Sequence, residues 1–136
     1  MVLNKIFFLA LIVLCNTCYA QKDSINIDIS PLYKCWTDSR EENEKGVLSK
    51  IYRPCDFKKF QSSWFRGRFE FKQNGECSWL HLAPNDAHYM IQGNWSYDKG
   101  QQIIIIKDKS EKIIYKFKVI SIATDLLKIE FIIKGE

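Results

Sequence analysis

WFRGRFEFKQNGECSWLHLAPNDAHYMIQGNWSYDKG, residues 64–100, is the stretch that decides the fold. Within it, Phe69 and Phe71 alternate with charged residues, which is typical of a strand with one buried face and one wet face. The dipeptide Asn74-Gly75 supplies the positive φ values that a tight hairpin requires. After the next turn, apolar and polar residues alternate again between Tyr89 and Tyr97. The stretch therefore predicts three short antiparallel strands joined by two turns.

Apolar or alternating runs bounded by turn residues extend this pattern on both sides. They predict further strands at residues 32–38, 47–53, 102–107, 113–119 and 126–133. No segment has the length and pattern of a helix that could cover a sheet, so closure is how such a chain would hide its strand edges. The sequence therefore predicts an all-β fold, an eight-stranded antiparallel up-and-down barrel, with a two-sheet sandwich as the alternative.

The pairing of the two strands that flank Asn74-Gly75 has two possible registers. A two-residue turn sets Phe71 opposite Ser78, whereas a three-residue turn with a bulge at Gly75 sets Phe71 opposite Cys77. A slip of one residue exchanges the two faces of the strand. We favour the bulged turn, because it gathers the large side chains and directs Cys77, Trp79 and His81 inward.

The first twenty residues have the pattern of a secretory signal peptide. Lys5 precedes the apolar run 6–14, and small residues at positions 18 and 20 predict cleavage after Ala20. Lipid anchoring through Cys15 or Cys18 is the alternative, although neither has the small residues that usually precede such a cysteine. The apolar run is too short for a transmembrane helix. We therefore expect a secreted or periplasmic protein.

Residues 21–136 have the length of one domain with a single core, and residues 21–31 are expected to form a loose polar arm. The full chain has 20 Lys and Arg and 16 Asp and Glu, and only Lys5 lies in the predicted signal. The predicted mature chain therefore carries a net charge of +3. This mild charge, with aromatic residues that share faces with aliphatic ones, does not favour nucleic-acid binding.

Three cysteines remain after the predicted cleavage: Cys35, Cys55 and Cys77. An oxidising compartment favours one disulfide and leaves one cysteine over, and the spacing alone does not give the pairing. We favour Cys35 with Cys55, because these two flank the first predicted hairpin. Cys77 lies within a predicted strand, where a free cysteine usually packs as a small apolar side chain.

Side chains of metal-binding and nucleophilic type occur close together in one part of the chain. They are Cys77, His81, Asp86 and His88. Structural zinc sites usually show tight pairs of ligands, which are missing here, so we predict no metal and no cofactor. A nucleophilic cysteine paired with a histidine needs a thiol in an electropositive, partly open setting, and packing explains Cys77 more simply. An enzyme is therefore the third hypothesis.

The arginines all fall in the first half of the chain. They are Arg40, Arg53, Arg66 and Arg68. Because arginine forms planar, bidentate pairs with carboxylates, we expect ion pairs with Glu41, Glu42 or Glu70 that lock the charged loop 39–46. A surface patch that binds anions is the alternative.

Many large side chains are predicted to point into the barrel, and these are the candidate ligand-binding residues. They are Trp36, Tyr52, Phe69, Phe71, Trp79, His81, Tyr89, Trp95, Tyr115 and Phe117, with Phe131 as a further ring. An eight-stranded barrel has room either for packed side chains or for one small ligand. The sequence leaves both possibilities open.

Three short motifs resemble those of bacterial lipocalin-like domains. They are Trp36 in the first strand, the Phe69-x-Phe71 strand that leads into Asn74-Gly75, and the Gly93-x-Trp95 strand. The segments 39–42, 52–54 and 83–86 look like those of a subgroup of small secreted proteins without an assigned activity. The resemblance implies an eight-stranded barrel that holds a small apolar ligand. The chain departs from the family in having Lys34 where the first-strand glycine is expected.

These observations lead to two hypotheses about function. The first is a non-enzymatic binding protein that holds a small hydrophobic or amphipathic molecule in the barrel. The alternative is a protein-interaction module, such as an inhibitor or an envelope accessory factor, with a packed barrel and working loops at 39–46, 55–63 and 83–88.

Overall fold

The computed structural model describes residues 26–135, so the predicted signal peptide at 1–20 lies outside the described residues. These residues form eight strands and two short 3-10 helices. The elements are η1 (Ser30–Leu32), β1 (Cys35–Asp38), η2 (Arg40–Glu42), β2 (Lys50–Pro54), β3 (Arg68–Phe71), β4 (Glu76–Leu82), β5 (His88–Asp98), β6 (Ile103–Lys107), β7 (Ile113–Ile122) and β8 (Leu127–Ile133). Neither helix is long and apolar enough to cross a membrane.

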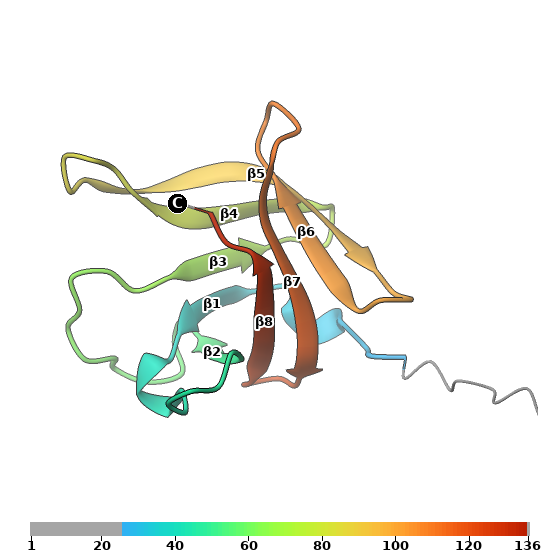
Figure 1. Cartoon of the computed structure of the whole chain (residues 1–136), viewed down its shortest axis with the longest axis horizontal. Coiled ribbons are helices and arrows are strands. Elements are labelled where there is room, and N and C mark those ends of the chain that lie inside the picture. The colour runs from blue at the N-terminus through green and yellow to red at the C-terminus, as the bar shows by residue number, and fades with distance from the viewer. Residues whose placement is uncertain (1–25, 136) are drawn as a thin grey trace, which may run out of the picture.

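The strands close into the predicted eight-stranded antiparallel barrel (Figure 1). From β3 to β8 each strand pairs with the next one in the chain. The first two strands are exchanged, because β1 pairs with β3 whereas β2 pairs with β8. The segment 55–67, which leads from β2 to β3, therefore has to pass β1, and we call it the crossover segment.

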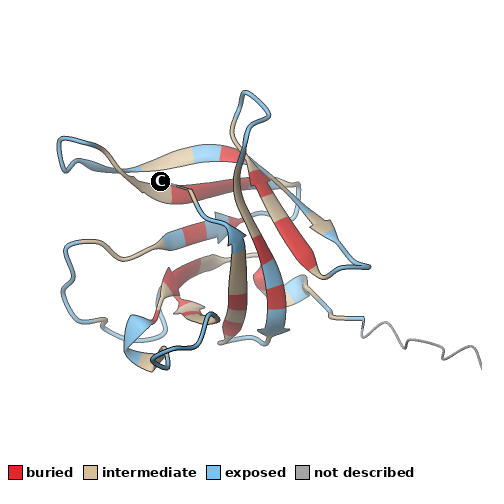
Figure 2. Cartoon of the chain, in the orientation of Figure 1, coloured by how far each residue is buried: buried red, intermediate tan, exposed pale blue. Residues whose placement is uncertain are grey.

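The register between β3 and β4 is that of the bulged turn. Phe71 lies opposite Cys77, and Phe69 lies opposite Trp79. Gly75 has a φ of +88°, which a residue with a side chain rarely adopts. This register directs the large side chains of both strands to the interior, as the sequence predicted. Figure 2 shows the resulting alternation of buried and exposed residues along β3.

One end of the barrel is closed by the residues that precede β1. Leu32 in η1 is completely buried, and its carbonyl oxygen accepts a hydrogen bond of 3.0 Å from Nε1 of Trp36. Ile27 and Ile29 pack against the same core. The expectation of a loose arm at 21–31 is therefore wrong for its described part, because these isoleucines alternate with polar residues and pack, partly buried, at the base of the barrel.

The opposite end of the barrel is open on one side, because β5 is longer than β6. β5 pairs with β4 from His88 to Asn94, but it pairs with β6 only from Asn94 onward. The β4–β5 hairpin and the β6–β7 hairpin therefore diverge, the first extending to the left and the second to the top of the view in Figure 1. Among the described residues, the edge of β5 that faces away from β4 has no strand partner between His88 and Gly93.

Gly93 lies at the point where the two hairpins separate. A Cβ atom at this position would clash with the carbonyl oxygen of Lys107 at the end of β6. It would also lie 2.8 Å from Cζ3 of Trp79. The missing side chain thus lets β6 approach β5 closely and lets the Trp79 ring lie on the backbone.

We predict that Gly93→Ala lowers the free energy of unfolding by about 2–3 kcal/mol, because the backbone of Lys107 and the Trp79 ring both have to shift. Urea denaturation measures this change. Gly100→Ala is the matched control, since a Cβ atom there meets only Oδ1 of Asp98 at 3.5 Å. Equal stability of the two variants would contradict the role of Gly93.

Candidate functional site

The lower part of the barrel is occupied mainly by packed aromatic side chains. Trp36, Phe69, Phe71 and Phe117 are buried, and so is Tyr52. The Phe69 ring lies 6.0 Å from the Phe71 ring and 5.8 Å from the Phe117 ring, measured between centroids. These predicted interior residues form the packed core rather than the wall of a calyx.

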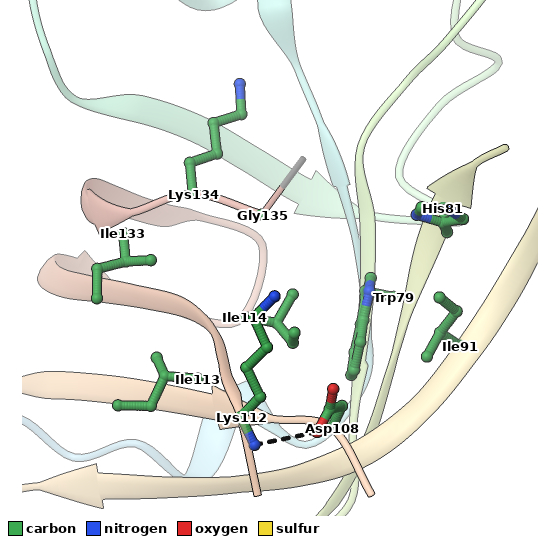
Figure 3. Close-up of a pocket in the computed structure, with 10 residues that line it drawn as sticks. All are labelled: Trp79, His81, Ile91, Asp108, Lys112, Ile113, Ile114, Ile133, Lys134 and Gly135. Atoms are coloured by element: carbon green, nitrogen blue, oxygen red, sulfur yellow. Dashed lines mark hydrogen bonds between the residues drawn. The ribbon is translucent and has the colours of Figure 1, made fainter. Parts of the chain in front are cut away.

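A pocket of about 380 Å³ lies at the open end, above this core (Figure 3). Its lining comes from β4 and β5, the β6–β7 hairpin and the end of β8. The lining residues are Trp79, His81, Ile91, Asp108, Lys112, Ile113, Ile114, Ile133, Lys134 and Gly135. Five of them are large apolar side chains, and four carry polar or charged groups. The volume lies near the lower end of the range for small-molecule sites in proteins.

The position of each wall follows from the strand pairing. Trp79 and Ile91 lie opposite each other on β4 and β5, so both project to the inner side. The register between β6 and β7 shifts at Ile106 and Lys107, and Ile113 begins β7 just past this irregularity. The opposite walls are therefore carried by two hairpins that diverge from Gly93.

The polar groups of the pocket are concentrated at the β6–β7 turn. Oδ1 of Asp108 accepts hydrogen bonds from the backbone amides of Ser110 and Lys112, at 2.8 and 3.0 Å, and from the Ser110 hydroxyl at 2.7 Å. The Ser110 hydroxyl, together with these amides and the charge of Lys112, holds the pKa of Asp108 below its usual range. The carboxylate thus stays ionised and shapes the turn.

The structure brings only some of the predicted interior residues to this pocket. Trp79 and His81 line it. Tyr115 instead lines a separate cavity of about 120 Å³, in which Tyr52, Phe69 and Phe131 also take part. Trp95 packs against Phe71 with a centroid distance of 5.6 Å, and its Nε1 donates to the carbonyl oxygen of Lys72, so it belongs to the wall near the closed end.

The prediction for Tyr89 as an interior residue is wrong. Its side chain is 49% exposed, and its ring lies against His81, with 5.3 Å between the ring centroids. Alternation assigned it to the inner face of β5. That part of β5, however, extends past the last residue that pairs with β6, so no opposite wall encloses the ring.

Most of the pocket lining was not predicted from the sequence. The isoleucine walls and the charged residues Asp108, Lys112 and Lys134 belong to no recognisable motif, and the predicted interior consisted mainly of aromatic side chains. One signal was present in the sequence. The alternating run that contains Tyr89 and Tyr97 is clearly longer than the isoleucine run 103–106 with which it pairs, and this difference in length indicates that the two strands separate.

Two of the arginines form the expected ion pairs with η2. Arg53 binds Glu42 through two hydrogen bonds of 2.7 and 2.9 Å. Arg66 binds Glu41 in the same bidentate way, at 2.6 and 3.0 Å. The guanidinium groups also lie over phenylalanine rings of the crossover segment, Arg53 over Phe57 and Arg66 over Phe60. They thus connect η2 with the crossover segment.

The other two predicted arginines have different environments. Arg40 donates a hydrogen bond to the carbonyl oxygen of Phe65 and lies 4.0 Å from a carboxylate oxygen of Asp38. Arg68 is exposed and has no ion pair within residues 26–135. Glu70, the third expected acidic partner, takes no part in the described ion pairs. The four arginines therefore do not form one anion-binding patch.

The cysteines have the expected arrangement. Cys35 and Cys55 form a disulfide that joins the start of β1 to the start of the crossover segment. Cys77 is free and buried, and burial raises the pKa of its thiol to about 12. A thiol that stays protonated at neutral pH does not fit the role of a nucleophile. Within residues 26–135, no group of three or more His, Cys, Asp and Glu side chains could hold a metal ion.

Comparisons with protein-family models, with curated proteins and with solved structures found no match to the chain.

We predict that Glu42→Gln lowers the free energy of unfolding by about 1 kcal/mol at neutral pH, because the variant loses its charged partner for Arg53. Hydrogen bonds from the Arg53 guanidinium and, to a smaller extent, from the Ser39 hydroxyl lower the pKa of Glu42 from its usual 4.5 to about 2. The carboxylate therefore stabilises the fold above pH 4.5, and this contribution is lost as the pH falls towards 2.

Urea denaturation at a series of pH values measures the difference between the wild type and this variant, which should shrink over that range. Glu44→Gln is the control and should leave stability unchanged, because Glu44 is exposed and forms no ion pair within the described residues. A difference between wild type and Glu42→Gln that stays constant down to pH 2 would contradict the account of the ion pair.

Proposed function

We propose that this protein is a non-enzymatic binding protein that holds a small hydrophobic or amphipathic molecule at the mouth of its barrel. The observation that carries the proposal is the pocket of about 380 Å³ between Trp79 and Ile91 on one side and Ile113, Ile114 and Ile133 on the other. Apolar walls with a few convergent polar groups are typical of small-molecule sites.

Binding fits the pocket better than catalysis does. The lining holds His81, Asp108 and two lysines but no serine or cysteine, and Oδ1 of Asp108 accepts the hydrogen bonds of its own turn. The buried thiol of Cys77 is protonated at neutral pH and is not part of the lining. The lining therefore offers shape and apolar contact rather than a nucleophile with a paired base.

We also propose a location outside the cytoplasm, either in the periplasm or in the secreted state. The disulfide between Cys35 and Cys55 supports this proposal, because such bonds persist in oxidising compartments. The pattern of residues 1–20 points in the same direction. The proposed kinship with lipocalin-like proteins is supported by the closed eight-stranded barrel, in which η1 and its flanking residues cover one end.

We predict that the protein enhances the fluorescence of a hydrophobic probe such as anilinonaphthalene sulfonate, and that Ile113→Glu weakens this binding about tenfold. The reason is that the variant places a charge on an apolar wall of the pocket. Ile120→Glu is the matched control. Ile113 and Ile120 lie on the same strand and are 38% and 41% exposed, but only Ile113 lines the pocket.

The control variant should bind the probe like the wild type. Equal loss of binding in both variants, or no binding by the wild type, would overturn the proposal. Circular dichroism of both variants checks that the fold is kept.

The second candidate is a protein-interaction module, and one surface favours it. Trp64, in the crossover segment, is 68% exposed and lies with Phe65 beside His88 of β5. Large exposed aromatic side chains are enriched in the centres of protein interfaces. A photo-crosslinker placed at Trp64 tests this candidate. Specific crosslinking there, with no probe binding at the pocket, would favour the interaction module over the binding protein.

A further inference from the structure

Lys112 is an exposed charged residue of the pocket lining, and its charge acts on Asp108 without forming a direct ion pair. Its neighbour Glu111 pairs instead with Lys107, at 3.3 Å. Among residues 26–135, no ion pair or side-chain hydrogen bond of the Lys112 ammonium is formed. Figure 3 shows the side chain extending from the turn in the direction of Ile114 and away from Asp108. A positive charge thus lies beside the apolar walls.

Asp108 is the one acidic residue of the lining, and the turn compensates its charge. Oδ1 accepts three hydrogen bonds, including the one from the backbone amide of Lys112. This bond places the backbone of Lys112 next to the carboxylate, whereas its side chain leads away from it (Figure 3). The carboxylate of Asp108 is thus held by its own turn, whereas the exposed ammonium group of Lys112 acts on it only through its charge, without a direct ion pair among the described residues.

The remaining titratable groups of the lining do not change this arrangement. The ammonium of Lys134 lies over the ring of Phe131, 5.8 Å from its centroid, and points away from the other lining side chains in Figure 3. His81 lies at the far side, with its ring against Tyr89. Both charged residues other than Asp108 are cationic, so the excess charge of the lining is positive.

We propose that the ligand of this pocket is a single-chain anionic amphiphile, whose apolar chain lies between Trp79 and the isoleucines and whose anionic group binds Lys112. This inference rests on the proposed function and names the ligand class for the same site. The volume of about 380 Å³ suits one short chain. Lysine acts as a point charge for carboxylates and phosphates alike, so both headgroups belong to the class.

Titration calorimetry of the purified protein with octanoate, octyl phosphate and octanol tests the inference. Lys112→Met should weaken the binding of both anions about fivefold, because an exposed ion pair contributes at most about that factor to the affinity. The same variant should leave the binding of octanol unchanged. Added salt should weaken the binding of the anions but not that of octanol. The tighter of the two anions identifies the headgroup.

Lys118→Met is the matched control, because it removes the same charge from the outer face of β7, where Lys118 is exposed between buried Phe117 and Val119. It should leave the affinity for the anions unchanged. If all three compounds bind and Lys112→Met matches the wild type, the inference is wrong while the proposed function stands. If octanol does not bind either, the proposed function is wrong and the inference falls with it.

Discussion

The close contact between β5 and β6 at Gly93 is the constraint on which the rest of the structure depends. The missing side chain admits the carbonyl of Lys107 and the ring of Trp79 to the same short piece of backbone. On one side of this contact the strands pair fully and enclose a core of aromatic rings. On the other side β5 continues without β6, the two hairpins diverge, and the pocket opens between them. One glycine thus marks the border between the packed barrel and the pocket.

The other half of the barrel is stabilised by a disulfide and by ion pairs that join residues distant in the sequence. Because β1 and β2 are exchanged, the crossover segment has to pass β1, and it has no strand pairing of its own. The disulfide fixes its start, and Arg53 and Arg66 hold its phenylalanines against η2. These contacts explain why the arginines concentrate in the first half of the chain. Arg53 and Arg66 thus have a structural role, and the cations that line the pocket are Lys112 and Lys134.

Much of the fold was predictable from the sequence, because alternation and turn residues act over short distances. The bulged turn at Gly75, the inward direction of Trp79 and the bidentate pairs of Arg53 and Arg66 all follow from neighbouring residues or from simple chemistry. The exchange of β1 and β2 was not predictable, since it depends on which edge of the sheet β2 closes. The pocket was missed for a related reason. Alternation assigns Tyr89 to the interior, but it does not show that β6 has already ended there.

Native mass spectrometry of the protein, purified from the cells that naturally produce it, tests most directly whether the mouth of the barrel holds a ligand. We expect an additional mass on the folded protein that disappears on denaturation, with a size that corresponds to one small amphipathic molecule. A folded protein that shows only the mass of its own chain, and that also takes up no hydrophobic probe, would contradict the account.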